Sequence, residues 1–309
     1  MQQRLFSYDD VYLKPKYSEL NSRADGDTSI NFLGQKYKLP VVPANMQDVI
    51  SWDIADQLQT NDYFYIMHRF DDANKKIPSK MIAGMNTKFL SISVGVNEEV
   101  FWADVGAPTF ITIDIAHGHH LKMIERIKYL KSLFPKSKII AGNVATSDGY
   151  KFLCDLGVDA VKVGIGGGSI CTTRYKTGFH IPTAYAVWDC ATNGDRDIPI
   201  IADGGAKHFG DIAKALVLGA DMVMSGRFFA ECIDSPAQIS HGQKIYRGST
   251  SYQAKGHNNH IEGKTLEIEW NCTYKERLIE IQQALQSSIS YAGGKDLSCF
   301  NNVEWGLLS

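Results

Sequence analysis

The chain has 309 residues, of which 44% are hydrophobic and 21% are charged, and its formal net charge is −2. This composition is typical of a globular enzyme and excludes collagen-like and disordered chains. Since 32 basic residues face 34 acidic ones, no basic excess exists to attract a nucleic acid or a membrane surface. A local site can still bind a small phosphorylated ligand.

The N-terminal residues carry charge early and lack an apolar stretch, so they do not predict a secretory signal. No apolar run approaches the roughly 18 residues that suggest a membrane-spanning helix. The six cysteines form no CxxC pair, which favours reduced thiols over a disulfide framework. We therefore expect a cytoplasmic protein without membrane or nucleic-acid partners, in which one thiol can be a nucleophile.

The first predicted element is a hairpin over residues 28–40, with Gly34 at its turn. Short apolar runs then recur through the chain, each closed by turn or polar residues. Unbroken apolar runs are typical of strands buried on both faces, as in a parallel sheet. The runs are residues 40–46, 63–69, 89–96, 110–116, 138–144, 160–166, 198–205 and 222–227.

Helices are predicted between the runs, because successive runs begin roughly 21 to 38 residues apart, which leaves room for a crossover helix. Three segments also show an apolar face at helical spacing, and the second ends near Gly219. Their predicted inward residues are Leu121, Ile124, Ile127 and Leu130, then Ile212, Ala215 and Leu216, then Leu278, Ile281, Leu285 and Ile289.

Eight strands alternating with helices predict an α/β fold, specifically a (β/α)8 TIM barrel formed by residues 1–309 as one domain. A doubly wound sheet is the alternative, because periodicity does not reveal whether a sheet closes. The hairpin would cover the bottom of the barrel. The polar segment 246–264, after the eighth run, is either a solvated loop or a mobile flap over the C-terminal face, where barrel active sites lie.

A glycine-rich loop, residues 164–173, follows the sixth run. Clustered glycines let backbone groups approach a ligand closely, so this loop can bind a phosphate with help from Ser169, coordinate a monovalent cation, or do both. Cys171 ends the loop beside Arg174, where cationic charge and backbone dipoles stabilise a thiolate, so we predict a nucleophile. The cysteines at 154, 190, 232, 272 and 299 are predicted to be small core groups.

Two more strand ends carry glycine: Asp203-Gly204-Gly205 and Ser225-Gly226-Arg227. Phosphate sites in barrels often use the loops after strands seven and eight. Glycine amides there can bind a phosphomonoester, and Asp203 can accept hydrogen bonds from ribose hydroxyls. Asp-Gly-Gly can also be a simple tight turn. That interpretation is less favoured here, because three glycine loops occur at successive strand ends.

Asp114 and the histidines at 117, 119 and 120 follow the fourth run. No second cluster with ligand spacing appears at another strand end, so we predict no catalytic metal and place Asp114 at the pocket wall. The glycine spacing near residues 164–169 is only a weak dinucleotide fingerprint, because the acidic residue expected about 20 residues later is missing. A dinucleotide would therefore bind across the barrel mouth.

Taken together, these motifs resemble the IMP dehydrogenase/GMP reductase family along nearly the whole chain, and most closely its reductase branch. The Cys171 loop and the Asp-Gly-Gly turn are the most specific elements. The other matching motifs are Ser7-Tyr8-Asp9-Asp10-Val11, Ser22-Arg23, Pro43-Ala44-Asn45-Met46, Ala141-Gly142-Asn143-Val144, Glu262-Gly263-Lys264 and Ser290-Tyr291-Ala292-Gly293-Gly294.

The resemblance implies a barrel enzyme of purine nucleotide salvage, usually a homotetramer. It implies that Cys171 attacks C2 of the purine of GMP and that ammonia leaves. Hydride from NADPH would then reach C2 of the covalent thioimidate and release IMP. Thr173 and Glu262 match the residues that move protons during ammonia release.

The resemblance also implies binding roles. The phosphate and ribose positions are matched by Ser169, Asp203, Gly204, Gly205, Ser225 and Gly226, and the base positions by Gly248, Ser249 and Glu262. The cofactor positions are matched by Asp114, Ile115, Ala116, Asn143 and Tyr291. A monovalent-cation site, expected to hold K⁺, is matched by the backbone oxygens of Gly166, Gly168 and Cys171.

Two features favour a reductase over an IMP dehydrogenase, which converts IMP to XMP with NAD. The dehydrogenases carry a regulatory insert of about a hundred residues, which does not fit in this chain. Their flap carries an Arg-Tyr pair that activates water, whereas residues 250–262 contain no arginine. A dehydrogenase without the regulatory domain is the alternative. Gly167 stands where many relatives have proline, and His68 stands where some reductases have lysine. The detailed contacts to the base and to the cofactor therefore stay open.

Overall fold

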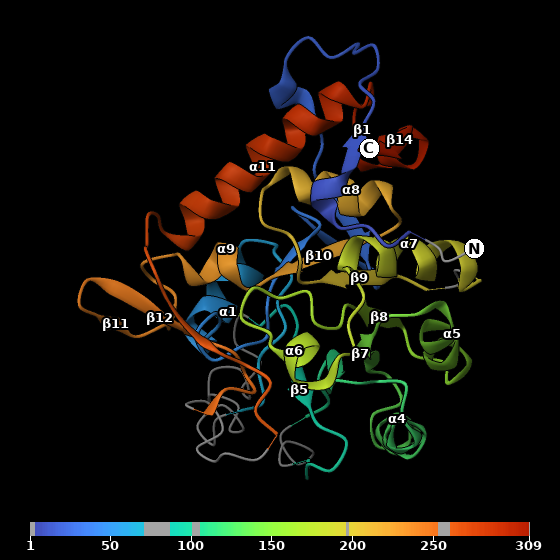
Figure 1. Cartoon of the computed structure of the whole chain (residues 1–309), viewed down its shortest axis with the longest axis vertical. Helices are drawn as coiled ribbons and strands as arrows, with labels where there is room; N and C mark the ends of the chain where they lie inside the picture. The colour runs from blue at the N-terminus through green and yellow to red at the C-terminus, as the bar shows by residue number, and fades with distance from the viewer. Residues whose placement is uncertain (1–3, 71–86, 101–105, 196–197, 253–259, 309) are drawn as a thin grey trace.

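Seven parallel strands form the centre of the computed structural model, which describes residues 4–70, 87–100, 106–195, 198–252 and 260–308 (Figure 1). Their order is β4-β10-β9-β8-β7-β6-β5, so the first strand pairs with the last, as in a sheet that curls towards closure. The strands are β4 (Val41–Pro43), β5 (Ser91–Val94), β6 (Phe110–Asp114), β7 (Lys138–Val144), β8 (Ala160–Val163), β9 (Ile200–Asp203) and β10 (Met222–Ser225).

Seven of the eight predicted strands are confirmed, and the exception is the run at 63–69. Within this run, the strand pairing that the structure describes is one bridge between Met67 and Ile92 of β5. The rings of Phe64 and Tyr65 are fully buried against neighbouring aromatic side chains. Aromatic packing, rather than a hydrogen-bonded ladder, therefore explains the aromatic residues at the start of this run. The architecture is an α/β fold around a curled, seven-stranded parallel sheet.

The predicted hairpin is confirmed as β2 (Ile30–Phe32) and β3 (Gln35–Tyr37), with Gly34 in the turn at a φ of 85°. The hairpin leads directly into β4, at the end where the parallel strands begin. Phe32 and Tyr37 are buried in an aromatic cluster with Phe64 and Phe89, whose rings contact Phe110 of β6. The hairpin therefore covers the amino ends of the strands and leaves their carboxyl ends open.

Helices lie on the outside of the sheet (Figure 1). Ser51, Thr146 and Thr273 cap three of them, because each side chain accepts a hydrogen bond from a backbone N–H of the first turn. The helices are α1 (Trp52–Thr60), α4 (Leu121–Leu133), α5 (Ser147–Asp155), α6 (Thr173–Thr177), α7 (Thr183–Asn193), α8 (Gly210–Val217), α9 (Arg227–Ala230) and α11 (Tyr274–Tyr291).

The predicted inward faces of α8 and α11 are confirmed, because every residue assigned to them is buried. The face assigned to α4 is wrong at Leu121, whose side chain is 74% exposed. The buried stripe of α4 runs instead through Met123, Ile127 and Leu130, at spacings of four and three residues. Leu121 is the first residue of the helix and lies off this stripe.

A three-stranded antiparallel sheet, absent from the sequence prediction, stands beside the parallel one. It contains β11 (Ile239–Ser240), β12 (Gln243–Arg247) and β13 (Thr265–Ile268). The predicted segment 246–264 is therefore wrong at its start, because its first two residues end β12. Residues 253–259 of that segment lie outside the described part of the chain.

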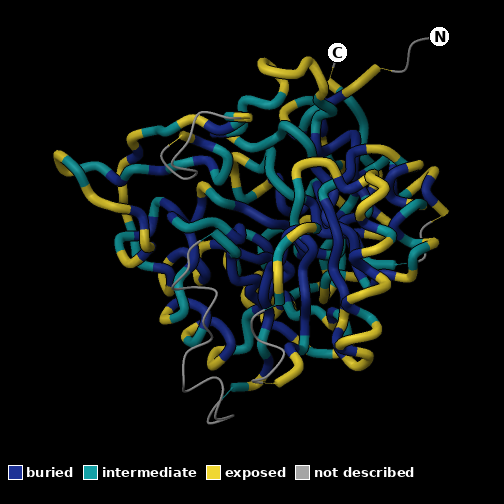
Figure 2. The backbone as a smooth tube through the Cα atoms, turned by 90° about the horizontal axis from the view of Figure 1, so that it is seen from below, coloured by how far each residue is buried: buried dark blue, intermediate teal, exposed yellow. Residues whose placement is uncertain are grey.

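The two ends of the chain meet, because β1 (Val11–Leu13) pairs antiparallel with β14 (Trp305–Leu307) (Figure 1). Figure 2 shows the buried backbone gathered in the middle of the molecule. None of the helices that the structure describes has the length and apolar character needed to cross a membrane. Short 3₁₀ turns occupy η1 (Tyr8–Asp10), η2 (Arg23–Asp25) and η4 (Leu297–Asn302).

The packing of α11 on α8 predicts unequal effects of two substitutions on one helix. Ile281 is fully buried and Ile279 is 41% exposed. Ile281→Ala should lower the free energy of unfolding by about 2–4 kcal/mol, because it leaves a cavity. Ile279→Ala should cost less than about 1 kcal/mol. Urea unfolding at one protein concentration measures both, and equal losses would contradict the assigned face.

Candidate active site

A cavity of about 210 Å³ opens at the carboxyl ends of the parallel strands. Because these ends meet at one rim, loops far apart in the sequence gather there. The loops after β4, β8, β9 and β10 contribute, together with residues that flank β12 and β13. The lining residues with predicted roles are Asn143, Gly166, Gly168, Cys171, Asp203, Gly204, Gly226, Gly248, Ser249 and Glu262.

A chain of hydrogen bonds runs from the thiol of Cys171 to a carboxylate. The Cys171 thiol donates to Thr173 Oγ1 at 3.1 Å, and the Thr173 hydroxyl donates to Glu262 Oε2 at 2.6 Å. A nucleophile linked through a hydroxyl to a carboxylate can pass a proton in either direction. The structure thus brings together the three residues predicted to be catalytic.

Backbone pairing holds Glu262 against the cysteine loop, 91 positions away in the chain. The N–H of Thr172 donates to the carbonyl of Glu262 at 2.7 Å, and the N–H of Lys264 donates to the carbonyl of Ile170 at 2.9 Å. Cys171 and Gly263 form the antiparallel bridge between these bonds. The cysteine loop is therefore paired, along its edge, with the segment that leads into β13.

Two glycines keep the cavity open where other residues would collide. Gly164 has a φ of 149°, and a Cβ there would lie 2.1 Å from the carbonyl oxygen of Asp203. A Cβ on Gly226 would lie 2.0 Å from the hydroxyl of Tyr246. Since real Cβ contacts are much longer, both strand ends need glycine to come this close to their neighbours.

Three predicted ligand residues share these loops but do not line the cavity. Ser169 is exposed within the cysteine loop. Ser225 is buried, and its hydroxyl accepts the N–H of Phe228 at 3.4 Å, next to α9. Gly205 follows the lining residue Gly204. The prediction of these three as direct ligands stays a prediction.

A second cavity of about 200 Å³ adjoins the first. The two share six lining residues, among them Asn143 and Asp203. Asp114, Ile115 and Ala116, which were predicted to bind a cofactor, line the second cavity. The Asn143 amide N–H₂ donates to the carbonyl of Gly164 at 2.8 Å and to Asp203 Oδ2 at 2.7 Å. Asn143 therefore stands on the wall between the two cavities.

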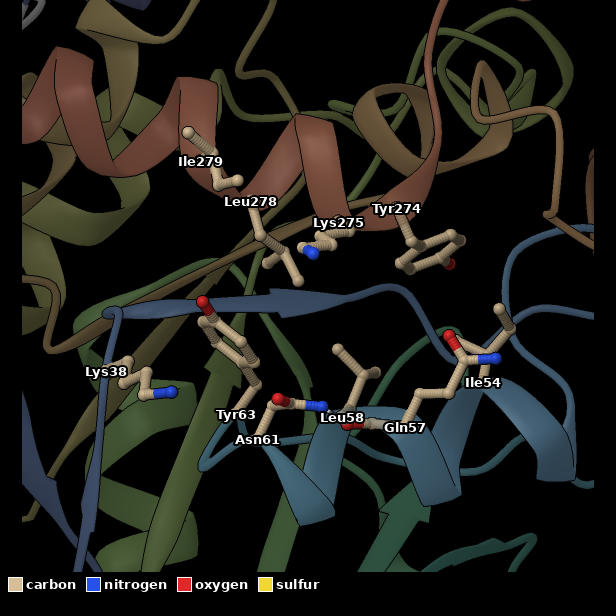
Figure 3. A pocket seen from close by; sticks show the side chains of 10 residues that line it. All are labelled: Lys38, Ile54, Gln57, Leu58, Asn61, Tyr63, Tyr274, Lys275, Leu278 and Ile279. Carbon is tan, nitrogen blue, oxygen red and sulfur yellow. Dashed lines mark hydrogen bonds between the residues drawn. The ribbon is translucent and has the colours of Figure 1, made fainter.

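The fifth predicted cofactor residue, Tyr291, lies elsewhere. It is 64% exposed at the end of α11 and borders a separate hollow with Leu13 and Lys14. A larger hollow of about 390 Å³ lies between α1 and α11, with Lys38 and Tyr63 at one side (Figure 3). No residue with a predicted role lines this larger hollow.

The second cavity contains a set of paired charges. The Lys162 ammonium lies 2.9 Å from Asp114 Oδ1 and 3.3 Å from Asp203 Oδ2. Burial alone would raise the pKa of Asp114, but the positive charges of Lys162 and Arg69 outweigh it and lower this pKa. Burial likewise opposes the charge of Lys162, yet Asp114 and Asp203 raise its pKa. Asp114 and Lys162 are therefore both ionised at neutral pH.

The histidines of this region have structural surroundings. His120 accepts the N–H of Lys122 at 3.1 Å and so caps α4, while the ring of His119 packs on Phe152. His68 is buried beside the second cavity. Among the described residues, no group of three or more His, Cys, Asp and Glu side chains could hold a metal ion.

Comparison with known proteins decides the family. The family model for the IMP dehydrogenase / GMP reductase domain matches residues 93–304. Proteins named GMP reductase from Staphylococcus carnosus and Bacillus subtilis are each 44% identical over 98% of this chain and 96% of their own length. One from Oceanobacillus iheyensis is 45% identical over 98% and 95%. The chain belongs to the IMP dehydrogenase/GMP reductase family.

Family membership confirms the resemblance that the motifs predicted, and the structure adds Tyr246 to the residues of the candidate site. Tyr246 lines the first cavity and was not predicted to have a role. Burial, together with the nearby charges of Asp203 and Asp48, raises the pKa of Tyr246, so its hydroxyl stays neutral. The signal in the sequence was its place two residues before Gly248-Ser249, at the start of the predicted flap.

All six cysteines are free, as the sequence predicted. Cys190 and Cys232 are buried in the core. Burial raises the pKa of Cys190, Cys232 and Cys272, and raises that of Cys299 to about 11. Cys171 differs from these four, because it lines the first cavity.

This contrast predicts selective alkylation. Iodoacetamide near neutral pH should modify Cys171 at least about tenfold faster than Cys272, because only thiolates react readily and burial keeps Cys272 protonated. Cys272 is a matched control, since it too is partly exposed. Mass spectrometry of timed digests measures both rates. Equal rates, or faster labelling of Cys272, would contradict the assignment of Cys171 as the reactive thiol.

Proposed function

We propose that this protein is a GMP reductase, an oxidoreductase that converts GMP to IMP and ammonia with NADPH as reductant. The observation that carries this conclusion is the hydrogen-bonded chain from Cys171 through Thr173 to Glu262, at the rim of the strands. A protein that only binds a nucleotide has no use for a nucleophile joined to a proton relay. The names of the relatives support the same reaction.

Cys171 is the nucleophile in this mechanism. Its thiol proton passes through the Thr173 hydroxyl to the Glu262 carboxylate, and the sulfur adds to C2 of the guanine ring. The protonated Glu262 then returns the proton through Thr173 to the departing nitrogen, which leaves as ammonia. A covalent thioimidate between Cys171 and the purine remains.

The second half of the reaction reduces C2 and breaks the bond to sulfur. NADPH, when bound, supplies the hydride that C2 accepts. The C2–S bond then breaks, so that IMP is released and Cys171 leaves as a thiolate, which takes up one proton from solvent to restore the thiol. Hydride transfer needs a site from which water is excluded, because water at C2 would give XMP instead.

The substrate is held mainly by glycine loops and hydroxyl groups. Asp203 accepts hydrogen bonds from the ribose hydroxyls, and the purine lies against the backbone of Gly248 and Ser249. The neutral hydroxyl of Tyr246, beside Gly226, faces the same end of the cavity. The phosphate is assigned to the loops that contain Ser169, Gly204, Gly205, Ser225 and Gly226.

The second cavity fits the nicotinamide end of NADPH. Asn143 Oδ1 is a buried acceptor without a hydrogen-bond partner among the described residues. A carboxamide N–H₂ is the kind of donor that such an acceptor needs. Asp114, Ile115 and Ala116 form the opposite wall. Tyr291 lies away from both cavities and would reach a cofactor from another subunit, in keeping with a homotetramer.

We propose further that the backbone oxygens of Gly166, Gly168 and Cys171 contribute to a K⁺ site. Neutral carbonyl oxygens are the ligands that replace water around K⁺ in proteins. The carbonyl of Gly168 also accepts the N–H of Cys171 at 3.1 Å, which curls the loop towards such a site. An ion held there would stabilise the loop that carries the nucleophile.

For the whole chain, we propose one closed (β/α)8 barrel over residues 1–309, in the cytoplasm, without a regulatory insert. Residues 63–69 would be the remaining strand, since Met67 already bridges to β5. The segment 246–264 would act as a flap. Support for the flap comes from its described ends, which supply Ser249 and Glu262 to the cavity.

IMP dehydrogenase is the alternative function, with IMP and NAD as substrates and XMP as product. It is the weaker candidate because residues 250–262 contain no arginine to activate water. One assay separates the two. GMP with NADPH should consume NADPH and release one ammonia for each NADPH, whereas IMP with NAD should give no XMP. XMP formation without GMP reduction would establish the dehydrogenase.

Substitutions in the proton relay should lower kcat to different extents. Cys171→Ala should lower it by about 10³-fold or more, because no covalent intermediate can form. Thr173→Val and Glu262→Gln should each cost about 10²- to 10³-fold, since the relay loses one member. Cys299→Ala, which removes a thiol in η4, is the control and should keep kcat within about twofold. A normal rate for Cys171→Ala would exclude this mechanism.

A further inference from the structure

Lys162 is a buried lysine with three polar partners at the boundary of the two cavities. It is 1% exposed, although it stands in β8 between apolar neighbours. Its ammonium lies 2.9 Å from Asp114, 3.3 Å from Asp203 and 3.1 Å from Asn45 Oδ1. The cost of burying an ammonium group is therefore offset by acceptors for all three of its N–H bonds.

The neighbouring strand is built around this lysine. Gly142 of β7 is paired with Lys162, and a Cβ on Gly142 would lie 2.6 Å from Lys162 Cβ. Any other residue at 142 would displace the lysine or the strand. The pairing also shifts register between Gly142 and Val144, where Asn143 turns towards Asp203. Glycine and asparagine in β7 thus accommodate the lysine and one of its carboxylates.

The two carboxylates would repel each other without the lysine. Asp114 Oδ1 and Asp203 Oδ2 lie 2.9 and 3.3 Å from the same atom, Lys162 Nζ, so these two oxygens are no more than about 6 Å apart. Like charges at that distance in a buried site favour protonation of one carboxylate. Asp203 lines both cavities, and Asp114 lines the second.

The other charged and titratable groups here do not replace Lys162. Arg69 Nε lies 3.8 Å from Asp114 Oδ2, and the guanidinium also pairs with Glu98. Asp203 also raises the pKa of Tyr246, whose hydroxyl is neutral and therefore supplies no positive charge. Among these neighbours, Lys162 therefore supplies the cation that Asp203 needs.

We infer that Lys162 is a positioning residue that keeps Asp203 ionised and oriented towards the substrate ribose, and that joins this carboxylate to Asp114 in the second cavity. The inference rests on the proposed function, because it takes GMP as the ligand of the first cavity. Lys162 itself touches no reacting atom. It acts through the two carboxylates.

The wild-type cluster should not change its charge between about pH 6 and pH 9. Asp114 has a lowered pKa, so its contribution is lost only when the pH falls through that value. Lys162 has a raised pKa, so its contribution is lost only when the pH rises through that value. Both limits lie outside the range, so these two groups should add no pH dependence to GMP affinity beyond that of the ligand's own phosphate, which titrates near pH 6.

Lys162→Met tests the inference by removing the charge and keeping an unbranched side chain. At pH 8 the Kd for GMP, measured by calorimetry, should rise about 10- to 100-fold. The loss relative to wild type should grow as the pH falls to 6, because Arg69 still pairs with Asp114 and the proton therefore goes to Asp203, which then no longer accepts from the ribose. Lys162→Arg keeps the charge and should restore the pH dependence of wild type, even if its larger head group raises the Kd somewhat.

The double variant Asp114→Asn/Lys162→Met separates positioning from simple support of the fold. It removes the cation and one of the two anions, so the repulsion that perturbs Asp203 is gone. Its Kd for GMP should return to within about fivefold of wild type and regain the pH dependence of wild type. If Lys162 only supports the fold, a second buried substitution should weaken binding further. A double variant that binds worse than Lys162→Met would overturn the inference, and it supplies the test where the single variant does not fold.

Lys244→Met is the matched control. Lys244 is equally buried, but its ammonium binds the carbonyl and hydroxyl of Ser235, at 2.8 and 2.6 Å. Its loss should leave the Kd for GMP within about threefold, with the pH dependence of wild type. A loss of affinity in this control that grows as the pH falls would show that any buried lysine has the effect, and would overturn the inference.

A readout without ligand distinguishes failure of the inference from failure of the proposed function. The melting temperature of Lys162→Met should rise as the pH falls from 8 to 6, while that of the wild type should change little. If wild type binds no GMP but the melting temperatures follow this pattern, the proposed substrate is wrong and the charge cluster stands. If wild type binds GMP and Lys162→Met follows the pH dependence of wild type in both measurements, the inference is wrong.

Discussion

The site depends on one short stretch of backbone pairing, between residues 170–172 and residues 262–264. Two hydrogen bonds of 2.7 and 2.9 Å place the segment before β13 beside the cysteine loop. This pairing lets three ordinary side chains form the proposed relay, because the Thr173 hydroxyl must stand within hydrogen-bond distance of both the Cys171 thiol and the Glu262 carboxylate. Two loops that were not paired would move independently of each other. The distances from the Thr173 hydroxyl to the thiol and to the carboxylate would then not stay fixed.

The pairing continues into the antiparallel sheet and from there to the first strand. The N–H of Gly248 donates to the carbonyl of Lys264 at 3.0 Å, which ties β12 to the same segment. At the end of β12, Arg247 donates through its backbone N–H at 2.7 Å and through Nε at 2.9 Å to Asp48. The side chain of Asp48 is 1% exposed, so this ion pair is largely shielded from solvent. The loops after β4 and β8 are therefore linked through the small sheet as well as through the parallel strands.

Sequence patterns predicted those parts of the fold that rest on local signals. Apolar runs marked seven strands, and the spacing of Ile281 and Ile289 marked the inner face of α11. In the run at 63–69, ring packing buries the aromatic residues, and the strand pairing that the structure describes is limited to the bridge from Met67 to Ile92. Leu121 was wrongly predicted to face inward, because it is the first residue of α4 and lies off the buried stripe of that helix. In both places tertiary contacts determine the local structure and burial. The periodicity of a sequence carries no information about such contacts.

The site was predictable where glycine or cysteine carries the signal, and unpredictable where an ordinary residue acquires a role from its neighbours. Cys171 stood out beside its glycine loop, and the family resemblance led to Glu262. The sequence around Lys162 did not indicate its role, because a lysine within an apolar run is normally expected to extend its ammonium group into solvent. Its partners Asp114 and Asp203 end strands β6 and β9, and only the curl of the sheet brings them to one ammonium group.

The strand β8 and its loop therefore supply two kinds of group to the same rim. Lys162 lies within the strand, where packing fixes its position, and Cys171 lies on the loop that follows, where the backbone is held by pairing to residues 262–264. A buried charge needs a rigid surrounding, because each misplaced acceptor leaves an N–H unsatisfied. A nucleophile needs access to substrate and space for a leaving group. Placing the paired charge on the strand and the proposed nucleophile on the loop meets both needs. Since Asp114 and Asp203 offset the charge of Lys162, the anionic phosphate is assigned to the glycine loops and not to this cluster.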